Sequence, residues 1–202
     1  MASTRGRFSG FALAGLLCFV GSAGCHPAPE DAAATPEAPE LAALRADFGA
    51  LVTAARAGDA AGVQKRLDAY VATPAEFETL FGPQRGPQAH AAYLEKVVKG
   101  LAAEGGPTLV ERVRGGQTEV VIEEVGPAFP ARTTPGDHRL LDAFVGRFKL
   151  YTVRLHAPEE PLGFRLDGFV RVGPRWVGLF RTFDHLTPEA PSAPDSAAPT
   201  SP

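Results

Sequence analysis

The feature that most restricts the possible folds is a change of hydrophobic period along the chain. Between residues 40 and 103, apolar residues recur every three or four positions, which is typical of amphipathic helices. From residue 108 to residue 183, apolar and polar residues mostly alternate, as in strands that bury one face. Helices that cover one face of an antiparallel sheet make an α+β domain. The sequence therefore predicts N-terminal helices packed on an antiparallel sheet of about five strands.

Caps and turns divide these two halves into elements. The capping residues Asp59 and Thr73, the latter in a capping box with Glu76, indicate helix starts, and Thr134 with Asp137 indicates a brief later helix. The predicted helices span residues 40–57, 59–71, 73–81, 87–103 and a short stretch from 134. The predicted strands span residues 108–114, 117–125, 148–156, 162–172 and 175–183, with Gly115-Gly116 as the turn of the first hairpin.

The clearest alternation lies in residues 162–172, and it bears on a possible catalytic acid. The alternation predicts that apolar residues share the buried face: Leu162, Phe164, Leu166, Val170 and Val172. The same pattern sends Arg165, Asp167 and Arg171 to the opposite face. A buried Asp167 could act as a general base with a raised pKa. The alternation favours instead a row of solvated charges across the outer face of the sheet.

The two ends of the chain differ in composition from the middle. Residues 26–39 and 187–202 are rich in Pro, Ala, Ser, Thr and acidic residues, and such segments cannot bury enough apolar surface to fold. We therefore predict a disordered linker over residues 25–39 and a disordered tail over residues 187–202. One α+β domain of about 147 residues, 40–186, lies between them, which is enough for a single core.

The first 24 residues have the features of a signal peptide. Arg5 and Arg7 precede the apolar segment Phe8–Val20, whose 13 residues are fewer than the ~20 that span a bilayer. Small residues then lead to a cysteine, in the stretch Gly21-Ser22-Ala23-Gly24-Cys25. Cys18 lies inside the apolar segment and would leave with it. An ordinary cleaved signal that leaves Cys25 as a free thiol remains an alternative.

At these residues the segment resembles a bacterial lipoprotein signal. The resemblance implies cleavage before Cys25 and a diacylglyceride attached to its sulfur, usually with acylation of the new amino group. Two or more acyl chains make membrane attachment stable. We therefore expect a protein anchored in a bacterial cell envelope, at the outer membrane rather than the inner one. Its domain would lie in the periplasm or at the cell surface.

Two stretches of the domain resemble another group of proteins. The residues AGDAAGVQKRLDAY (57–70) and DGFVRVGPRWVGL (167–179) look like the helix junction and closing hairpin of the ketosteroid-isomerase-like, or nuclear-transport-factor-like, fold. That resemblance implies a curved, cone-like sheet around a cavity. The family includes enzymes as well as non-catalytic binding domains, so the fold alone does not decide the function.

Charge and motifs exclude several classes of function. The chain has 20 Lys and Arg and 23 Asp and Glu; two of the bases lie in the leader and five of the acids in the tails, which leaves 18 of each in the domain. A neutral domain lacks the basic patch that nucleic-acid binding requires. The sequence contains none of the usual spacings for a metal site, a phosphate loop or a nucleophile elbow. We expect no cofactor and no bound metal.

Two functions remain in view. The first is a non-catalytic domain that binds an envelope protein, a wall component or a small apolar ligand, and it is the favoured one. The second is a small-molecule enzyme of the cone-like fold that uses His90 with a buried carboxylate. A carboxylate within hydrogen-bond reach of His90 would separate the two. The residues expected to line the pocket in either case are Tyr70, His90, Tyr93, Phe164 and Leu166.

Overall fold

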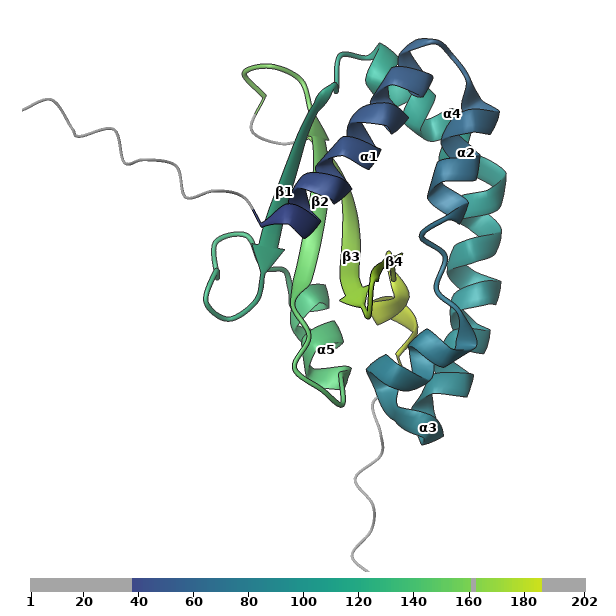
Figure 1. Cartoon of the computed structure of the whole chain (residues 1–202), viewed down its shortest axis with the longest axis vertical. Coiled ribbons are helices and arrows are strands. Elements are labelled where there is room, and N and C mark those ends of the chain that lie inside the picture. The colour runs from purple at the N-terminus through teal and green to yellow at the C-terminus, as the bar shows by residue number, and fades with distance from the viewer. Residues whose placement is uncertain (1–37, 161–162, 187–202) are drawn as a thin grey trace, which may run out of the picture. The chain divides into compact units, whose positions relative to one another are not determined.

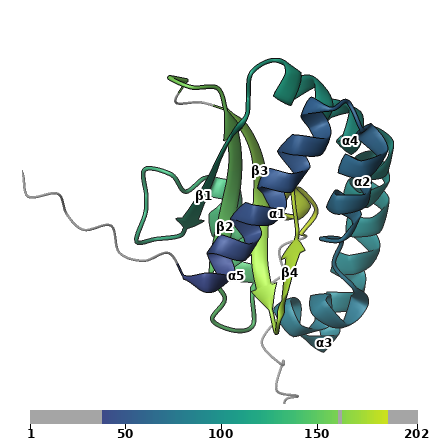
Figure 2. The same cartoon turned by 45° about the horizontal axis from the view of Figure 1, so that its top comes forward.

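The structure is a computed structural model that describes residues 38–160 and 163–186. These residues form helices and a four-stranded antiparallel sheet, so the predicted α+β class is confirmed, with four strands instead of about five. Helix α1 (Pro39–Arg56) lies across the sheet, with α2 (Ala60–Asp68), α3 (Pro74–Tyr93) and α4 (Lys99–Arg114) beside it (Figure 1; Figure 2). The predicted signal peptide, Cys25, the linker up to residue 37 and the C-terminal tail lie outside the described residues.

The first two helices follow from their capping residues. Asp59 Oδ1 accepts a hydrogen bond from the Gly62 N–H at 2.8 Å, as predicted for the cap of α2. Gly58 has φ +78°, and this left-handed conformation ends α1. The apolar stripe of α1 is buried as expected, with Leu44, Phe48, Leu51, Val52 and Ala55 facing the core.

Helix α3 begins at the predicted capping box. The Thr73 N–H donates to Glu76 Oε2 at 2.7 Å, and the Glu76 N–H donates to Thr73 Oγ1 at 3.3 Å. Gly82 has φ +81° and interrupts the helical geometry just before Pro83, where we expected the helix to stop. The chain returns to helix at once. The predicted short helix and the start of the predicted 87–103 helix are thus two arms of one kinked element.

The largest departure from the sequence prediction lies at residues 104–117. A π-helix, η1 (Leu94–Val98), follows α3, and α4 then runs to Arg114. The predicted strand 108–114 and its hairpin are therefore wrong. The Gly115-Gly116 pair ends the helix instead. Gly116 has φ +100°, and the N–H groups of Gly116 and Gln117 donate to the carbonyls of Val113 and Arg112.

The triplet Gly105-Gly106-Pro107 follows the end of the helix predicted over residues 87–103, but it lies inside α4, which packs against α2. A Cβ on Gly106 would lie 2.4 Å from the Ala60 carbonyl oxygen, so glycine allows a close approach of the two helices. The Gly106 N–H also donates to Gln64 Oε1 of α2 at 2.9 Å. Tertiary packing here outweighs the weak helix propensity of the triplet.

The sheet has the order β1-β2-β3-β4 with antiparallel neighbours. Its strands are β1 (Glu119–Val125), β2 (Leu150–His156), β3 (Phe164–Val172) and β4 (Arg175–Gly178). Helix α5 (Pro135–Ala143) precedes β2 and starts at the predicted cap, where Thr134 and Asp137 form a capping box. The last strand is shorter than the predicted 175–183, because Phe180 takes φ +48° and a 3-10 turn, η2 (Thr182–His185), follows.

A bulge at Asp167 and Gly168 reverses the predicted alternation of side chains in β3. Both residues lie opposite one residue of β2, Thr152, and the flanking pairs are Val153 with Leu166 and Tyr151 with Phe169. Gly168 has φ +79°, which glycine adopts without strain. Since paired residues point to the same face, Leu166 and Phe169 share one face of the sheet. Val170, predicted beside Leu166, lies on the other face.

The bulge also places Arg165 and Arg171 on opposite faces. Arg171 lies 3.7 Å from Glu40 of α1, whereas Arg165 Nη2 donates to Asp137 Oδ2 of α5 at 2.7 Å. Arg165 also pairs with Asp167, and the side chains of both are about one-fifth exposed. The predicted row of three solvated charges is therefore wrong. Two of its members form a half-buried ion pair beneath α5, and the third reaches α1.

The main core lies between the helices and the sheet. The ring of Phe169 in β3 forms T-shaped pairs with Phe48 and with Tyr70, each at a centroid distance of 5.4 Å. Phe48 and Tyr70 stack on each other at 5.6 Å. Phe180 completes the cluster at 5.8 Å from Phe169. Such aromatic pairs contribute about 0.5–1.5 kcal/mol each beyond the area that they bury. The cluster joins α1, β3 and the chain beyond β4.

An ion pair holds β4 against the helical layer. Arg175 Nη1 lies 2.7 Å from both carboxylate oxygens of Glu76, and its Nη2 donates to the carbonyls of Ala69 and Val71 at 2.7 and 2.8 Å. Burial opposes ionisation of Glu76, but hydrogen bonds from Thr73 and Arg175 hold its pKa below the ordinary value. The cap of α3 is thus also the attachment point of β4.

Candidate functional site

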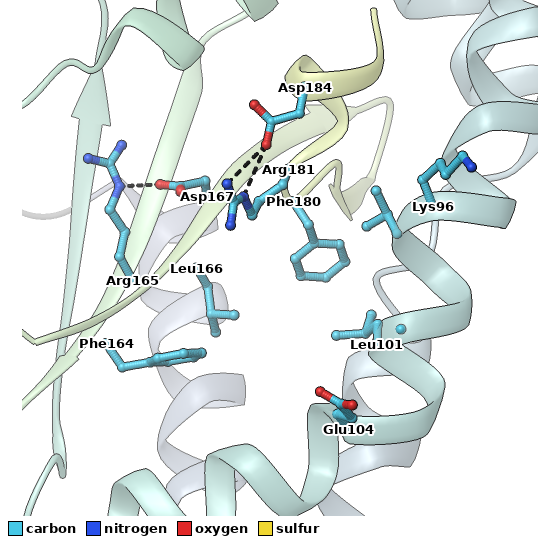
Figure 3. A pocket seen from close by; sticks show the side chains of 12 residues that line it. Lys96, Leu101, Glu104, Phe164, Arg165, Leu166, Asp167, Phe180, Arg181 and Asp184 are labelled. Carbon is cyan, nitrogen blue, oxygen red and sulfur yellow. Dashed lines mark hydrogen bonds and ion pairs between the residues drawn. The ribbon is translucent and has the colours of Figure 1, made fainter.

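A cleft of about 620 Å³ lies between the helical layer and the sheet. One wall comes from η1 and the first turns of α4, and the other from β3 and the segment after β4 (Figure 3). This volume falls in the range of about 300–1,000 Å³ usual for small-molecule sites. The lining residues are Lys96, Val97, Gly100, Leu101, Glu104, Phe164, Arg165, Leu166, Asp167, Phe180, Arg181 and Asp184.

The middle of the cleft is apolar. Phe164, Leu166 and Phe180 line the sheet side, where Leu166 and Phe180 are only 8 % and 6 % exposed. Val97 and Leu101, one helical turn apart, line the helix side and are half-buried. Figure 3 shows Leu101 across the cleft from Leu166 and Phe180. Apolar side chains that face each other across open space favour an apolar occupant.

Most of the charged groups around the cleft have partners on the protein. Arg181 Nη2 lies 3.0 Å from Asp184 Oδ2, and Asp184 is also 3.6 Å from Arg139. Arg165 pairs with Asp167, whose carboxylate points toward that guanidinium and away from the apolar middle (Figure 3). Lys96 lies 3.3 Å from its neighbour Glu95, and both are well exposed. These paired charges thus belong to the rim of the cleft or point away from it, whereas Glu104 lies beside Leu101 (Figure 3).

Asp167 is the carboxyl group at the cleft wall with a perturbed pKa. Burial raises the pKa of Asp167, and the pairing with Arg165 opposes this rise. Arg165 also donates to Asp137, which is 1 % exposed and accepts from the Thr134 N–H at 2.7 Å. One guanidinium thus joins the bulge of β3 to the first turn of α5. This arrangement is that of a structural clamp, since the carboxylates are engaged by the protein itself.

Three irregularities of the backbone meet at this cleft. The π-helix η1 supplies Lys96 and Val97, the β3 bulge supplies Asp167, and Phe180 has φ +48°, which is rare for an aromatic residue. Single π-helical turns, bulges and strained residues are all enriched at functional sites. Their convergence on one apolar cleft marks it as the candidate functional site.

Two of the five predicted pocket residues line this cleft. Phe164 and Leu166 lie in it, but Tyr70 does not. Tyr70 is buried among aromatic rings, and its hydroxyl donates to Asp47 Oδ2 at 3.2 Å. Burial, reinforced by Asp47, raises the pKa of Tyr70. Tyr70 is also among the residues that line a second cleft, of about 370 Å³, beside Trp176.

Tyr93 belongs to the core and His90 lies partly buried against it, and neither lines the cleft. Tyr93 is fully buried, its hydroxyl donates to the Gly178 carbonyl at 2.8 Å, and burial raises its pKa to about 12. His90 Nε2 lies 3.2 Å from the Ala72 carbonyl oxygen, and its ring meets the edge of Phe77 at 5.1 Å. In the part of the chain that the structure describes, no carboxylate contacts His90.

The sequence pattern missed the helix side of the cleft and Phe180. Val97 and Leu101 belong to the apolar stripe that predicted a core-facing helix, and the π-helical turn changes which way that stripe points. Leu94, a member of the same stripe, is accordingly 43 % exposed. Gly100 was a usable signal. Glycine lowers the stability of a helix that contains it, so a glycine inside a helix indicates a local packing or functional reason.

The described ranges offer little else for chemistry. Over residues 38–160 and 163–186, no three His, Cys, Asp or Glu side chains come together as a metal ion would require. None of the helices in these ranges combines the length and the apolar character needed to cross a membrane. Comparison of the chain with protein-family models, with curated proteins and with solved structures gave no match.

Proposed function

We propose that this chain is a lipid-anchored protein of a bacterial cell envelope whose domain binds a small apolar ligand without transforming it. The observation that carries the proposal is the cleft of about 620 Å³ between α4 and β3, whose middle is apolar although six of its twelve lining residues are charged. Apolar side chains that face each other across an open space, without packing together, need a reason. A bound apolar molecule would supply the contacts that the two walls do not make with each other.

The geometry favours binding over catalysis. The alternative enzyme would need His90 beside a carboxylate. Instead, His90 Nε2 is within hydrogen-bond distance of the Ala72 carbonyl oxygen, and its ring packs against Phe77 and Tyr93. Asp167, at the cleft wall, is paired with Arg165. General acid–base catalysis requires a group within hydrogen-bond reach of the reacting atom, and this carboxylate points away from the apolar middle.

The fold resemblance is part of the same proposal. Helices beside an antiparallel sheet, with a cleft between the two layers, agree with a cone-like domain of the ketosteroid-isomerase-like kind. The irregular β3, with its bulge at Gly168, gives the strand a local bend of the sort that curved sheets use. Non-catalytic binding domains are among the members of that family, which fits the function proposed here.

The cleft can be tested with a neutral dye. The mature chain from residue 25 onward, carrying Cys25→Ser, lacks both the apolar leader and the proposed acylation site. It therefore needs no detergent and would be titrated with N-phenyl-1-naphthylamine. We expect saturable enhancement of dye emission, and Leu101→Glu should weaken binding by about tenfold or more because it places a charge in the apolar wall. Ala102→Glu, on an exposed position of α4 outside the cleft, is the matched control.

Two results would contradict the binding function. Dye emission that rises linearly without saturation would mean that the cleft is not a site. Equal affinity of the Leu101→Glu and Ala102→Glu variants would place the dye elsewhere. Circular dichroism spectra of all variants should match, so that loss of binding is not loss of the fold.

The anchor is tested separately in cells. Wild-type protein should fractionate with membranes. When residues 1–24 are replaced by an ordinary cleaved secretory signal, Cys25→Ser should be released into the soluble fraction, because neither the leader nor a thioether-linked lipid holds it. Mass spectrometry of the wild-type N-terminus should find an acylated Cys25 in place of Met1. A Cys25→Ser protein that stays in the membrane fraction would refute the anchor while leaving the cleft proposal intact.

A further inference from the structure

We infer that the ligand of this cleft is an uncharged, elongated apolar molecule whose body lies over Gly100 of α4. The inference rests on the proposed binding function and adds the chemical class of the ligand. Three features of the cleft support it: the pairing of four of its charges, the positions of the exposed Lys96 and Glu104 on the helix wall, and a glycine whose missing side chain leaves that wall open.

The first feature is that four of the six charged side chains lining the cleft are already paired within the protein. Arg165 is held by both Asp137 and Asp167, and Arg181 is held by Asp184. A ligand carboxylate would have to displace Asp184 or Asp167, and a ligand amine would have to displace Arg181 or Arg165. A charged ligand would therefore lose its hydration without gaining a free partner there. An uncharged ligand avoids this loss.

The second feature is the distribution of the other two charges on the helix wall. Lys96 and Glu104 are eight residues apart, which is about 12 Å along a helix axis, and the apolar residues Val97 and Leu101 lie between them. Both charged side chains are exposed, where water and salt screen them and an ion pair contributes little. They delimit an apolar strip of about 12 Å along the helix, which a chain-like or narrow molecule could follow.

The third feature is Gly100 in the middle of that strip. Gly100 lines the cleft, and a Cβ placed on it would meet no neighbouring atom within 4 Å. Packing within the described residues therefore does not require glycine at this position, although glycine inside a helix is unfavourable. The absent side chain leaves the backbone of α4 accessible from the cleft. Gly49 of α1 is equally open, so openness alone does not call for a ligand; Gly100 differs in lining the cleft, where a ligand can lie against its backbone.

The ligand class is tested with three probes that share a ten-carbon chain. Decanol, decanoate and decylamine would each be tested for displacement of N-phenyl-1-naphthylamine from the mature Cys25→Ser chain (residue 25 onward) at pH 7. We expect decanol to bind about tenfold or more tightly than either charged probe. Decanoate binding as tightly as decanol would assign a head-group role to Lys96 or Arg181, and decylamine doing so would assign one to Glu104. Either result would overturn the inference.

The position of the ligand is tested with Gly100→Leu, which fills the open wall with an apolar side chain. We expect decanol affinity to fall by about tenfold, whereas Ala102→Leu, on the same helix but outside the cleft, should leave it unchanged. Unchanged decanol affinity in Gly100→Leu would overturn the inference, as would dye binding that none of the three probes displaces. A dye that does not bind at all would instead refute the proposed function.

Discussion

Two glycines six residues apart on α4 are in opposite situations. Gly106 faces α2, where a Cβ would lie 2.4 Å from a backbone carbonyl oxygen, and Gly100 faces the cleft, where a Cβ would meet nothing within 4 Å. The first glycine is explained by close packing of two helices. The second weakens the helix with no packing benefit among the described residues. The same helix therefore completes a core on one side and keeps a space open on the other.

This contrast separates stability from function within one element. The α2 side of α4 buries Leu109 and Val113 almost completely, as a stable interface requires. The cleft side carries half-buried Leu101 and exposed Gly100. Substitutions on the two sides should therefore differ in both the size and the sign of their effects on the free energy of unfolding. Four experiments follow, in order of decreasing expected effect.

The largest effect is expected from truncating a leucine on each side. Leu109→Ala should lower the free energy of unfolding by about 3 kcal/mol, because Leu109 is 1 % exposed and its removal leaves a cavity. Leu101→Ala should lower it by less than about 1 kcal/mol, because its side chain already borders open space. Urea denaturation at pH 7 measures both. Similar losses for the two variants would mean that the two sides of α4 are equally packed.

The second effect concerns the packed glycine. Gly106→Ala should lower the free energy of unfolding by about 2 kcal/mol, because the new methyl group collides with the backbone of α2 and must push the two helices apart. Gly49→Ala on α1 is the matched control, since a Cβ there meets nothing within 4 Å. If Gly106→Ala proves as stable as Gly49→Ala, the close approach of α2 and α4 is wrong.

The third effect tests the ion pair that holds β4 to the helical layer. Glu76→Gln should lower the free energy of unfolding by about 1 kcal/mol at pH 7, because it removes the charge that Thr73 and Arg175 stabilise. The pKa of Glu76 is lowered in the folded state, so its contribution is complete above the ordinary pKa of 4.5 and disappears as the pH falls through the folded-state value.

The difference between wild type and Glu76→Gln should therefore shrink when the protein is unfolded by urea at pH values from 7 down to about 3. Glu78→Gln, on the exposed side of α3, controls for a change of net charge. A difference that is the same at every pH would show that Glu76 acts through packing and not through its charge.

The smallest effect has the opposite sign. Gly100→Ala should raise the free energy of unfolding by about 0.5–1 kcal/mol, because alanine favours the helix and its methyl group has room. Thermal denaturation at neutral pH is sufficient to measure it. A destabilised Gly100→Ala protein would mean that glycine is required for the fold itself, and the contrast with Gly106 would be lost.

Local signals in the sequence predicted much of the helical half. Asp59, Thr73 and Thr134 cap helices as expected, because a side-chain cap depends on residues only a few positions away. The Gly115-Gly116 pair was misread because two glycines serve equally as a hairpin turn or as a helix end. The choice between them is made by packing of α4 against α2, which involves Ala60, some 50 residues earlier in the chain.

The candidate site was predicted only on its strand side. Phe164 and Leu166 were found because alternation assigns faces within an uninterrupted stretch of strand. The bulge at Gly168 defeated the same rule for the residues that follow, since one extra residue exchanges the faces. The helix side depends on the π-helical turn, which has no comparably simple sequence pattern.

Trp176, the single tryptophan of the chain, gives the molecule an intrinsic optical reporter. Its indole N–H donates to the Glu40 carbonyl at 3.2 Å, and its ring meets Tyr151 edge-on at 5.4 Å. It borders the smaller cleft and not the proposed ligand site. Its emission should therefore follow the docking of the first turn of α1 onto the sheet. Trp176 emission would then report unfolding and the emission of bound N-phenyl-1-naphthylamine would report ligand binding, so both could be recorded in one sample.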